Sequence, residues 1–145
     1  MEITLASTYE QVDGAIKNVM AYAACGLGLS NGRFLFELDF VMRELLNNAV
    51  EHGNGGNPDK MIVFEIKTED AILQVCVVDE GACFDGQALA KILRQAGPVR
   101  AAMLPEGLAE RRRGLVTIAQ LGWILEVSPG RVVAWRRMSD ILAEK

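Results

Sequence analysis

The chain has 145 residues, half of them hydrophobic, and a formal net charge of −4. This size suits one domain around one sizeable core, so we expect a single domain over residues 1–145. The acidic balance argues against direct nucleic-acid binding, which needs a basic surface. The apolar runs are shorter than the roughly 20 residues that a membrane helix needs, and no basic segment precedes an apolar stretch at the N-terminus. We therefore expect a cytoplasmic protein that does not enter a membrane.

The predicted elements are helices mixed with β-hairpins. In chain order they are a strand at Glu2–Ala6, a helix from the capping-box pair Ser7 and Glu10 to Gly26, a helix from Arg33 to His52, and a hairpin with strands at Met61–Lys67 and Ile72–Val78. The next elements are a loop at Gly81–Gly86, a short helix at Gln87–Gln95 and a long loop at Gly97–Arg113. The last elements are a short helix at Leu115–Leu121, a hairpin with strands at Trp123–Val127 and Val132–Arg136, and a brief C-terminal helix. This pattern predicts an α+β fold: a two-layer sandwich of one mostly antiparallel, mixed sheet with helices on one face.

The helix at Arg33–His52 carries a line of polar residues beside its apolar face. At 100° per residue its apolar side chains fill one arc, which we expect to face the sheet. Glu44 and Asn48 are one turn apart and stack at the edge of this arc, and His52 continues the line. A carboxylate and a carboxamide would then border a cavity. The alternative is an ordinary solvated helix flank.

A second carboxylate stands at the end of the strand Ile72–Val78. Asp79 has the same parity as Leu73, Val75 and Val77, so it points toward the face that these residues bury. A buried carboxylate needs a partner. Gly81 follows at once, and without a side chain its backbone would let a flat ligand approach closely. The alternative is an ordinary Asp-Glu-Gly turn after a strand.

The third motif is a basic loop that leads into a helix. In RRRGLVTIAQLG, Arg111 to Gly122, three arginines precede Gly114 and a helical pattern. Free N–H groups at a helix N-terminus favour an anion, and nearby arginines add positive charge. The alternative is a solvated cluster of charges.

In their order and spacing, the three motifs resemble the GHKL ATPase superfamily, whose ATP-binding domain has the Bergerat fold. Glu-x-x-x-Asn on a helix is followed by Asp-x-Gly after a strand and by a glycine-led helix after a long loop, from about Phe34 to Trp135. The compact size, and Ala49, His52 and Gly53 after the asparagine, look most like the bacterial anti-sigma-factor serine/threonine kinases. Members of that branch phosphorylate a STAS-domain anti-anti-sigma protein.

The resemblance implies a role for each motif residue. Asn48 would hold Mg²⁺ that bridges the ATP phosphates, as an oxygen ligand suited to a hard cation. Glu44 would be the general base for the attacking hydroxyl. Asp79 would accept a hydrogen bond from the adenine amino group, with Gly81 leaving room for the ring. Gly114 and Leu115 would offer N–H groups to the phosphates, and Gly97–Arg113 would be the ATP lid, with Arg113 neutralising charge.

Two positions depart from the family's pattern. Cys83 stands at the second glycine of the first glycine box, and Arg112 at the first glycine of the second. A side chain forced into a left-handed conformation costs roughly 1–2 kcal/mol. The departures favour an alternative, a catalytically weak or degenerate nucleotide-binding module that sequesters a regulatory partner. A histidine-kinase catalytic domain would need a phosphoacceptor histidine, and the only histidine, His52, lies inside the candidate Mg²⁺ motif.

The resemblance also implies cofactors and partners. We expect ATP and Mg²⁺ as cofactors, and a STAS-domain anti-anti-sigma protein, with a sigma factor as a further candidate, as partners. The apolar residues of the first helix would either cover the core or form a homodimer, which the kinase branch often does; they are Ile16, Val19, Met20 and Tyr22. Cys25, Cys76 and Cys83 lack C-x-x-C spacing, and we interpret them as reduced thiols of the core or loops.

Overall fold

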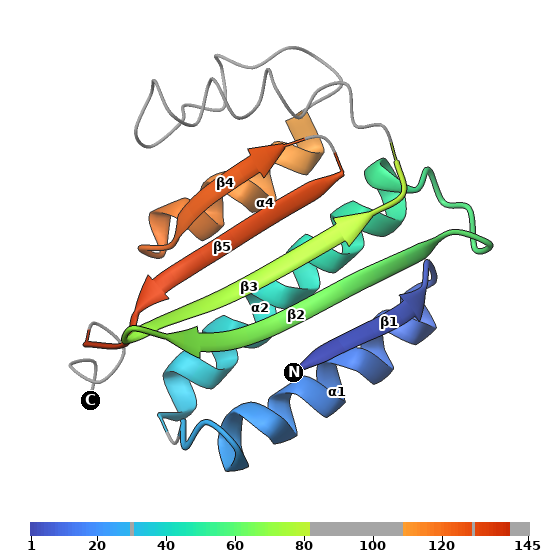
Figure 1. Ribbon diagram of the computed structural model, residues 1–145. Helices are drawn as coiled ribbons and strands as arrows, with labels where there is room; N and C mark the ends of the chain where they lie inside the picture. The colour runs from blue at the N-terminus through green and yellow to red at the C-terminus, as the bar shows by residue number, and fades with distance from the viewer. Residues whose placement is uncertain (30, 82–108, 129, 140–145) are drawn as a thin grey trace.

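A five-stranded sheet forms one layer of the molecule, and the helices form the other (Figure 1). The computed structural model describes residues 1–29, 31–81, 109–128 and 130–139, and for residues 109–113 it describes the backbone alone. The strands are β1 (Glu2–Ala6), β2 (Met61–Glu69), β3 (Ile72–Asp79), β4 (Ile124–Ser128) and β5 (Arg131–Arg137), and their order in the sheet is β1-β2-β3-β5-β4. The helices are α1 (Tyr9–Cys25), α2 (Gly32–Asn48) and α4 (Ala109–Gln120), with a π-helical turn η1 (Ala49–Gly53) directly after α2.

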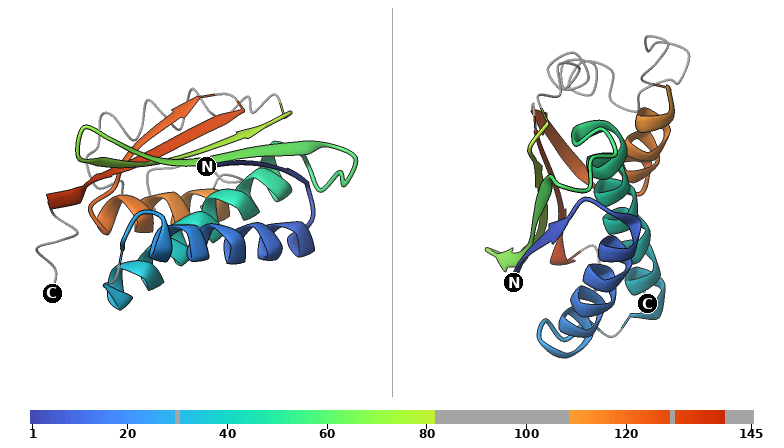
Figure 2. Two further views of the ribbon diagram at one scale, coloured as in Figure 1. Left: turned by 60° about the horizontal axis from the view of Figure 1, so that its bottom comes forward. Right: turned by 90° about the vertical axis from the view of Figure 1, so that its right-hand side faces the viewer.

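The predicted α+β sandwich is confirmed. The helices lie on one face of the sheet, with α2 between α1 and α4 (Figure 2). All four pairings among the described strands are antiparallel, so the mixed character expected from the sequence is absent from that part of the chain. None of the described helices is both long and apolar enough to span a membrane.

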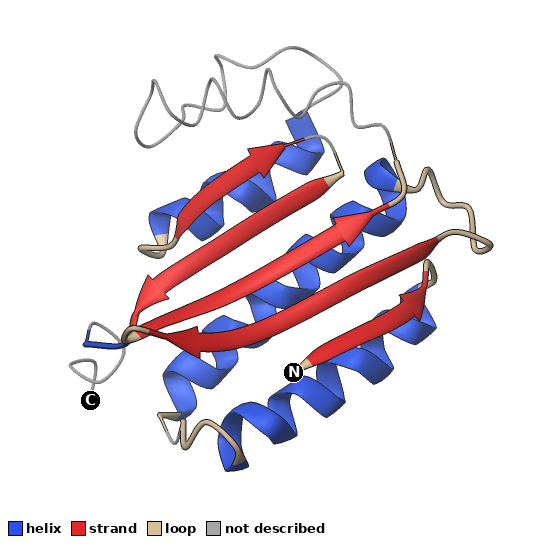
Figure 3. Ribbon diagram, viewed as in Figure 1, coloured by secondary structure: helices blue, strands red, loops and turns tan. Residues whose placement is uncertain are grey.

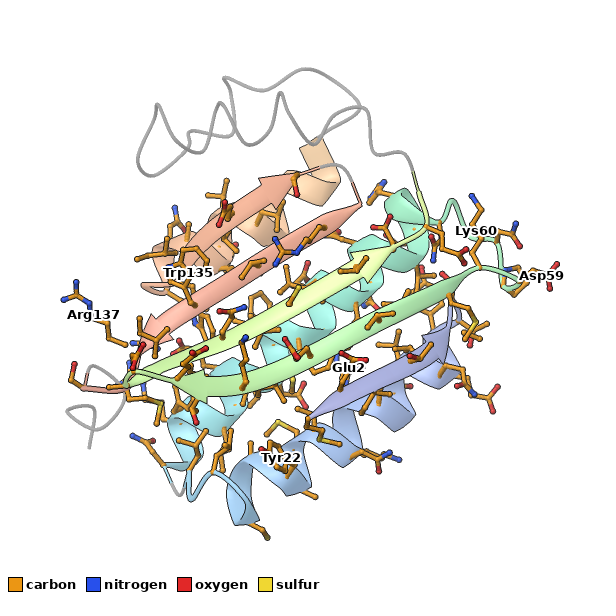
Figure 4. The ribbon with its side chains drawn as sticks, viewed as in Figure 1. Glu2, Tyr22, Asp59, Lys60, Trp135 and Arg137 are labelled. Carbon is orange, nitrogen blue, oxygen red and sulfur yellow. The ribbon has the colours of Figure 1, made fainter. Side chains whose placement is uncertain are left out.

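The core lies between the two layers. Alternating residues of β2 and β3 point into it, and the register pairs Phe64 with Val77 across the two strands. Its largest fully buried side chains include Phe34, Phe64, Ile16, Leu38 and Met42. None of the described helices lies on the other face of the sheet, which presents Glu2 on β1 and Trp135 on β5 (Figure 4).

α1 begins one residue later than the capping-box pattern predicts. The N-cap is Thr8, whose Oγ1 accepts a hydrogen bond from the Gln11 N–H at 3.2 Å. Ser7, the expected cap, is instead buried and accepts a hydrogen bond from the Asn54 side chain at 3.2 Å. The apolar residues of α1 pack on the core, with Ile16 and Val19 buried and Met20 and Tyr22 partly buried.

α4 differs most from the sequence prediction. It begins at Ala109, six residues before the predicted start at Leu115 (115 − 109 = 6; Figure 3). A glycine inside a helix costs only about 1 kcal/mol, and the arginines and glutamate before Gly114 are good helix formers. The helix therefore continues through Gly114 toward the N-terminus. The predicted helix at Gln87–Gln95 and residues 97–108 of the predicted lid lie outside the described residues.

A buried ion pair joins α2 to β5. The Arg136 guanidinium donates a hydrogen bond to Glu37 Oε1, and the two side chains are only 5% and 13% exposed. Trp123 Nε1 donates to the same oxygen at 2.9 Å. The Phe34 ring stacks on Trp123, with centroids 6.2 Å apart, and Arg136 Cζ lies 5.7 Å from the Phe34 centroid. The pair spans 99 residues of sequence and was not foreseen from it.

Breaking this pair from one side should destabilise the fold. We expect Arg136→Leu to lower the free energy of unfolding by about 3–5 kcal/mol, because it leaves the Glu37 carboxylate buried without its cation. The double variant Glu37→Gln/Arg136→Leu should recover part of this loss, since glutamine is neutral and still accepts the Trp123 hydrogen bond. Urea unfolding followed by tryptophan fluorescence measures both. A double variant less stable than Arg136→Leu would contradict the interpretation.

Candidate functional site

The candidate site lies along α2 and η1, where the end of β3, the start of β5 and α4 come together (Figure 1). The apolar residues of α2 face the sheet, with Phe34, Leu38 and Val41 fully buried. Glu44 is half-buried, and Asn48, one turn further on, is 7% exposed. The helix therefore holds the predicted carboxylate and carboxamide beside the core, one turn apart, as the spacing indicates.

The turn after Asn48 is wider than a normal helical turn. The Asn54 N–H donates to the Ala49 carbonyl at 2.7 Å, five residues back, and the Gly56 N–H donates to the Val50 carbonyl at 2.7 Å. Such π-helical turns inside helices are frequent at functional sites. The spacing of 100° per residue, from which the sequence placed His52 in line with Glu44 and Asn48, does not apply across this π-helical turn. His52 is exposed here, with Nε2 3.8 Å from Glu51 Oε2.

Asp79 lies where η1 meets the end of β3. Its Oδ1 accepts a hydrogen bond from the Gly81 N–H at 2.8 Å, and its own N–H donates to the Gly130 carbonyl at 2.9 Å. A Cβ atom at Gly53 would overlap the Asp79 carboxylate, and one at Gly81 would overlap the Gly53 carbonyl. Only glycine fits at position 81, where the obstacle is backbone, whereas a larger residue at position 53 would require the Asp79 carboxylate to move.

Asn54 connects the segments around this point, and sequence reasoning missed it. The side chain is buried and donates to Ser7 Oγ at 3.2 Å and to the Met61 carbonyl at 3.1 Å. Its Oδ1 accepts from the Glu80 N–H at 2.9 Å. Glu80 in turn accepts from the Met61 N–H at 2.5 Å through Oε2. Asn54 thus fixes the position of Glu80, the residue directly after Asp79. From the sequence, Asn54 had been interpreted only as one of the residues that end the helix.

α4 packs on the Glu44 carboxylate. A Cβ atom at Gly114 would overlap Glu44 Oε2, so a larger residue at this position would require the Glu44 carboxylate to move. Leu115 is fully buried in the core. Both are inside α4, as its sixth and seventh residues, whereas only the first four N–H groups of a helix lack a helical acceptor. For these two N–H groups to bind phosphate, the first turns of α4 would have to open.

The departure at Arg112 carries no strain in this arrangement. Residues 112 and 113 have helical backbone within α4, which any side chain adopts without the cost of a left-handed conformation. Cys83, the other departure, lies outside the described residues. Arg113 is placed by its backbone alone, at the residue before Gly114.

The electrostatic surroundings of Glu44 favour its protonated form. Burial raises the pKa of its carboxyl group, and the negative charge of Glu51 raises this pKa further. The hydroxyl of Tyr9, at the start of α1, donates a hydrogen bond to Glu51 Oε1. This hydrogen bond is the main cause of the raised pKa of Tyr9. The link between Tyr9 and Glu51 was also not foreseen from the sequence.

The predicted residues form one elongated site. Gly114 meets the helix at Glu44, and Asp79 meets it at Gly53, nine residues further along (53 − 44 = 9). Asn48 lies between them.

The fold is an α+β sandwich whose core helix α2 carries Glu44 and Asn48 one turn apart. The family model described as the histidine kinase-like ATPase domain matches residues 5–137, which is most of the chain. The chain therefore belongs to this family of ATP-binding domains. A comparison with curated proteins found no match.

The raised pKa of Glu44 predicts a stability that depends on pH. Between about pH 4.5, the ordinary value, and the raised native pKa, the folded state keeps a proton that the unfolded state has lost. Stability contributed by this group should therefore fall as pH rises through that window. We expect Glu44→Gln to be more stable than wild type at pH 7, with the difference vanishing below about pH 4.

Urea unfolding at a series of pH values, without nucleotide, measures this difference. Glu51→Gln is the comparison variant: it removes the second cause of the shift and keeps the first, so the pH dependence should shrink but persist. A Glu44→Gln variant that is less stable than wild type at pH 7 would contradict the assigned direction.

Proposed function

We propose that this chain is an ATP-dependent protein serine/threonine kinase of the anti-sigma-factor type. Its substrate would be a serine or threonine hydroxyl on a STAS-domain anti-anti-sigma protein in a partner-switching pathway, with a sigma factor as a further partner. The observation that carries the proposal is the half-buried Glu44, with its raised pKa, one turn from the buried Asn48. Family membership supports ATP binding, and this pair supports transfer chemistry beyond it.

Glu44 suits the role of general base. Proton transfer is efficient when the pKa of the base lies closer to the working pH, and both burial and Glu51 shift the pKa of Glu44 in that direction. The carboxylate would take the proton of the acceptor hydroxyl as its oxygen attacks the γ-phosphorus. The bond from this phosphorus to the bridging oxygen breaks, and ADP leaves. Gly114, directly against the carboxylate, would keep α4 close and water out.

The residues present fit a magnesium ion bound together with nucleotide. No group of three or more histidine, cysteine, aspartate or glutamate side chains that could hold a metal ion occurs in the described part of the chain. Mg²⁺ commonly binds through one or two protein oxygens together with substrate phosphates. Asn48 supplies an amide oxygen of this kind, midway along the site. When bound, the ion would neutralise charge on the phosphates.

Asp79 suits recognition of the adenine ring. One carboxylate oxygen is engaged by the Gly81 N–H, and the side chain is held against Gly53. A carboxylate oriented in this way would accept a hydrogen bond from an exocyclic amino group. The base would then lie at the η1 end of the site and the γ-phosphate at the Glu44 end.

A second candidate function is a nucleotide-binding module that sequesters its partner without catalysis. The helical state of Gly114 and Leu115 favours it, because the N–H groups expected to bind phosphate lie inside α4. The two candidates differ in whether phosphate is transferred.

Asp79→Asn should weaken adenine nucleotide binding by more than tenfold, or more than about 1.4 kcal/mol. Asparagine is nearly isosteric and its oxygen still accepts the Gly81 hydrogen bond, so the fold should survive. Isothermal calorimetry with ATP and Mg²⁺ measures the change. The matched control is Asp70→Asn in the turn at the other end of β3, where φ is 52° and asparagine is well tolerated. Equal affinities for wild type and Asp79→Asn would remove Asp79 as the adenine anchor.

Glu44→Gln and Asn48→Ala should fail in different ways. Glu44→Gln should still bind ATP with Mg²⁺, while phosphate transfer to a STAS-domain substrate falls by about 10²–10⁴-fold, the usual contribution of a positioned general base. Asn48→Ala should lose both Mg²⁺-dependent ATP binding and transfer. The measurements are transfer of labelled γ-phosphate and a binding titration, with Glu65→Gln on the open sheet face as control. Binding of ATP by wild type without labelling of any STAS domain from the same genome would favour the sequestering module.

A further inference from the structure

A groove on the surface between α2 and α4 is not part of the candidate site. It has a volume of about 320 Å³. From α2 it is lined by four residues at helical spacing, and from the other side by one residue of α4 and the residue directly after this helix; they are Arg33, Phe36, Glu37, Phe40, Thr117 and Leu121. The two helices lie side by side in the helical layer (Figure 2).

The groove exposes an aromatic side chain to water. Phe36 is 81% exposed and Leu121 is 37% exposed, and Phe40 adds a half-buried ring between them. Scattered apolar residues are common on protein surfaces, but apolar residues that gather in a groove mark interaction sites. Covering this surface would contribute about 25 cal/mol for each Å² removed from water.

The charges at the groove leave one cation uncompensated. Glu37 is neutralised by Arg136 and also accepts the Trp123 hydrogen bond. Arg33 is exposed, and no ion pair joins it to an acidic residue in the part of the chain that the structure describes. It stands in the first turn of α2, where a positive charge opposes the helix dipole and a carboxylate would be favoured. The rim therefore complements an acidic group.

We propose that this groove binds an amphipathic helix of a partner protein, with its apolar stripe on Phe36, Phe40 and Leu121 and an acidic side chain beside Arg33. A groove between two helices accepts a third helix by ridge-and-groove packing. An extended peptide would find no strand edge there to pair with, whereas a helix satisfies its own backbone groups. The proposal concerns this surface alone and does not depend on nucleotide binding.

The test is a selection from a displayed library of helical peptides of about 18 residues, or about 27 Å of helix. Peptides are selected on the wild-type chain alone, without nucleotide, and Phe36→Glu, which leaves the core intact because the ring is exposed, is kept for the comparison of affinities. Fluorescence anisotropy then gives the affinity of the best peptide. We expect it to carry apolar residues at positions i, i+3 or i+4, and i+7 with a flanking glutamate, and to bind Phe36→Glu at least tenfold more weakly.

Two controls make the result specific. Ile124→Glu changes another exposed apolar residue, 55% exposed on β4 and outside the groove, and should leave peptide binding unchanged. Arg33→Glu should weaken binding at least fivefold, and a peptide with lysine in place of its glutamate should restore it. Peptides that bind wild type and Phe36→Glu equally, or a charge swap without rescue, would overturn the proposal. So would sedimentation showing a wild-type dimer that Phe36→Glu dissociates, because the occupant would then be a second copy of the chain.

Discussion

The contact between the Gly81 backbone and the Gly53 carbonyl is the constraint on which the candidate site depends. It brings the end of β3 directly against the end of the helix that carries Glu44 and Asn48. No side chain larger than hydrogen fits at position 81, because the obstacle there is the backbone of Gly53. Asn54 holds the same junction through hydrogen bonds to three segments. The orientation of Asp79 follows from this junction and not from its strand alone.

The π-helical turn makes this junction possible. In a continuous α-helix, residues 49–53 would keep the α-helical spacing of α2, whereas in η1 they form a wider π-helical turn. The Asn54 and Gly56 N–H groups bond back into it. The buried Asn54 side chain can then reach Ser7 and Met61 on the neighbouring segments. A local deviation from ideal geometry thus places the polar groups, as is common where a fold supports a site.

Much of the fold and part of the site could be predicted from the sequence. Apolar periodicity identified α1 and α2, and strand parity placed Asp79 with Leu73, Val75 and Val77, because these patterns are local. The Glu37–Arg136 pair and the Tyr9–Glu51 hydrogen bond join residues far apart in the chain, and no local pattern encodes them. The start of α4 was misplaced because Gly114 was interpreted as a helix start, whereas a contact with Glu44 explains the glycine.

α4, like α2, contributes to both surfaces. Gly114 touches the Glu44 carboxylate midway along α4, and Leu121, directly after the last residue of the helix, lines the groove together with Phe36. Opening the first turns, which would free the Gly114 and Leu115 N–H groups for phosphate, need not disturb Thr117 or Leu121. Movement of the whole helix would change both surfaces together. Energetic coupling carried by α4 would therefore require this helix to move as a unit, and it would act equally in both directions.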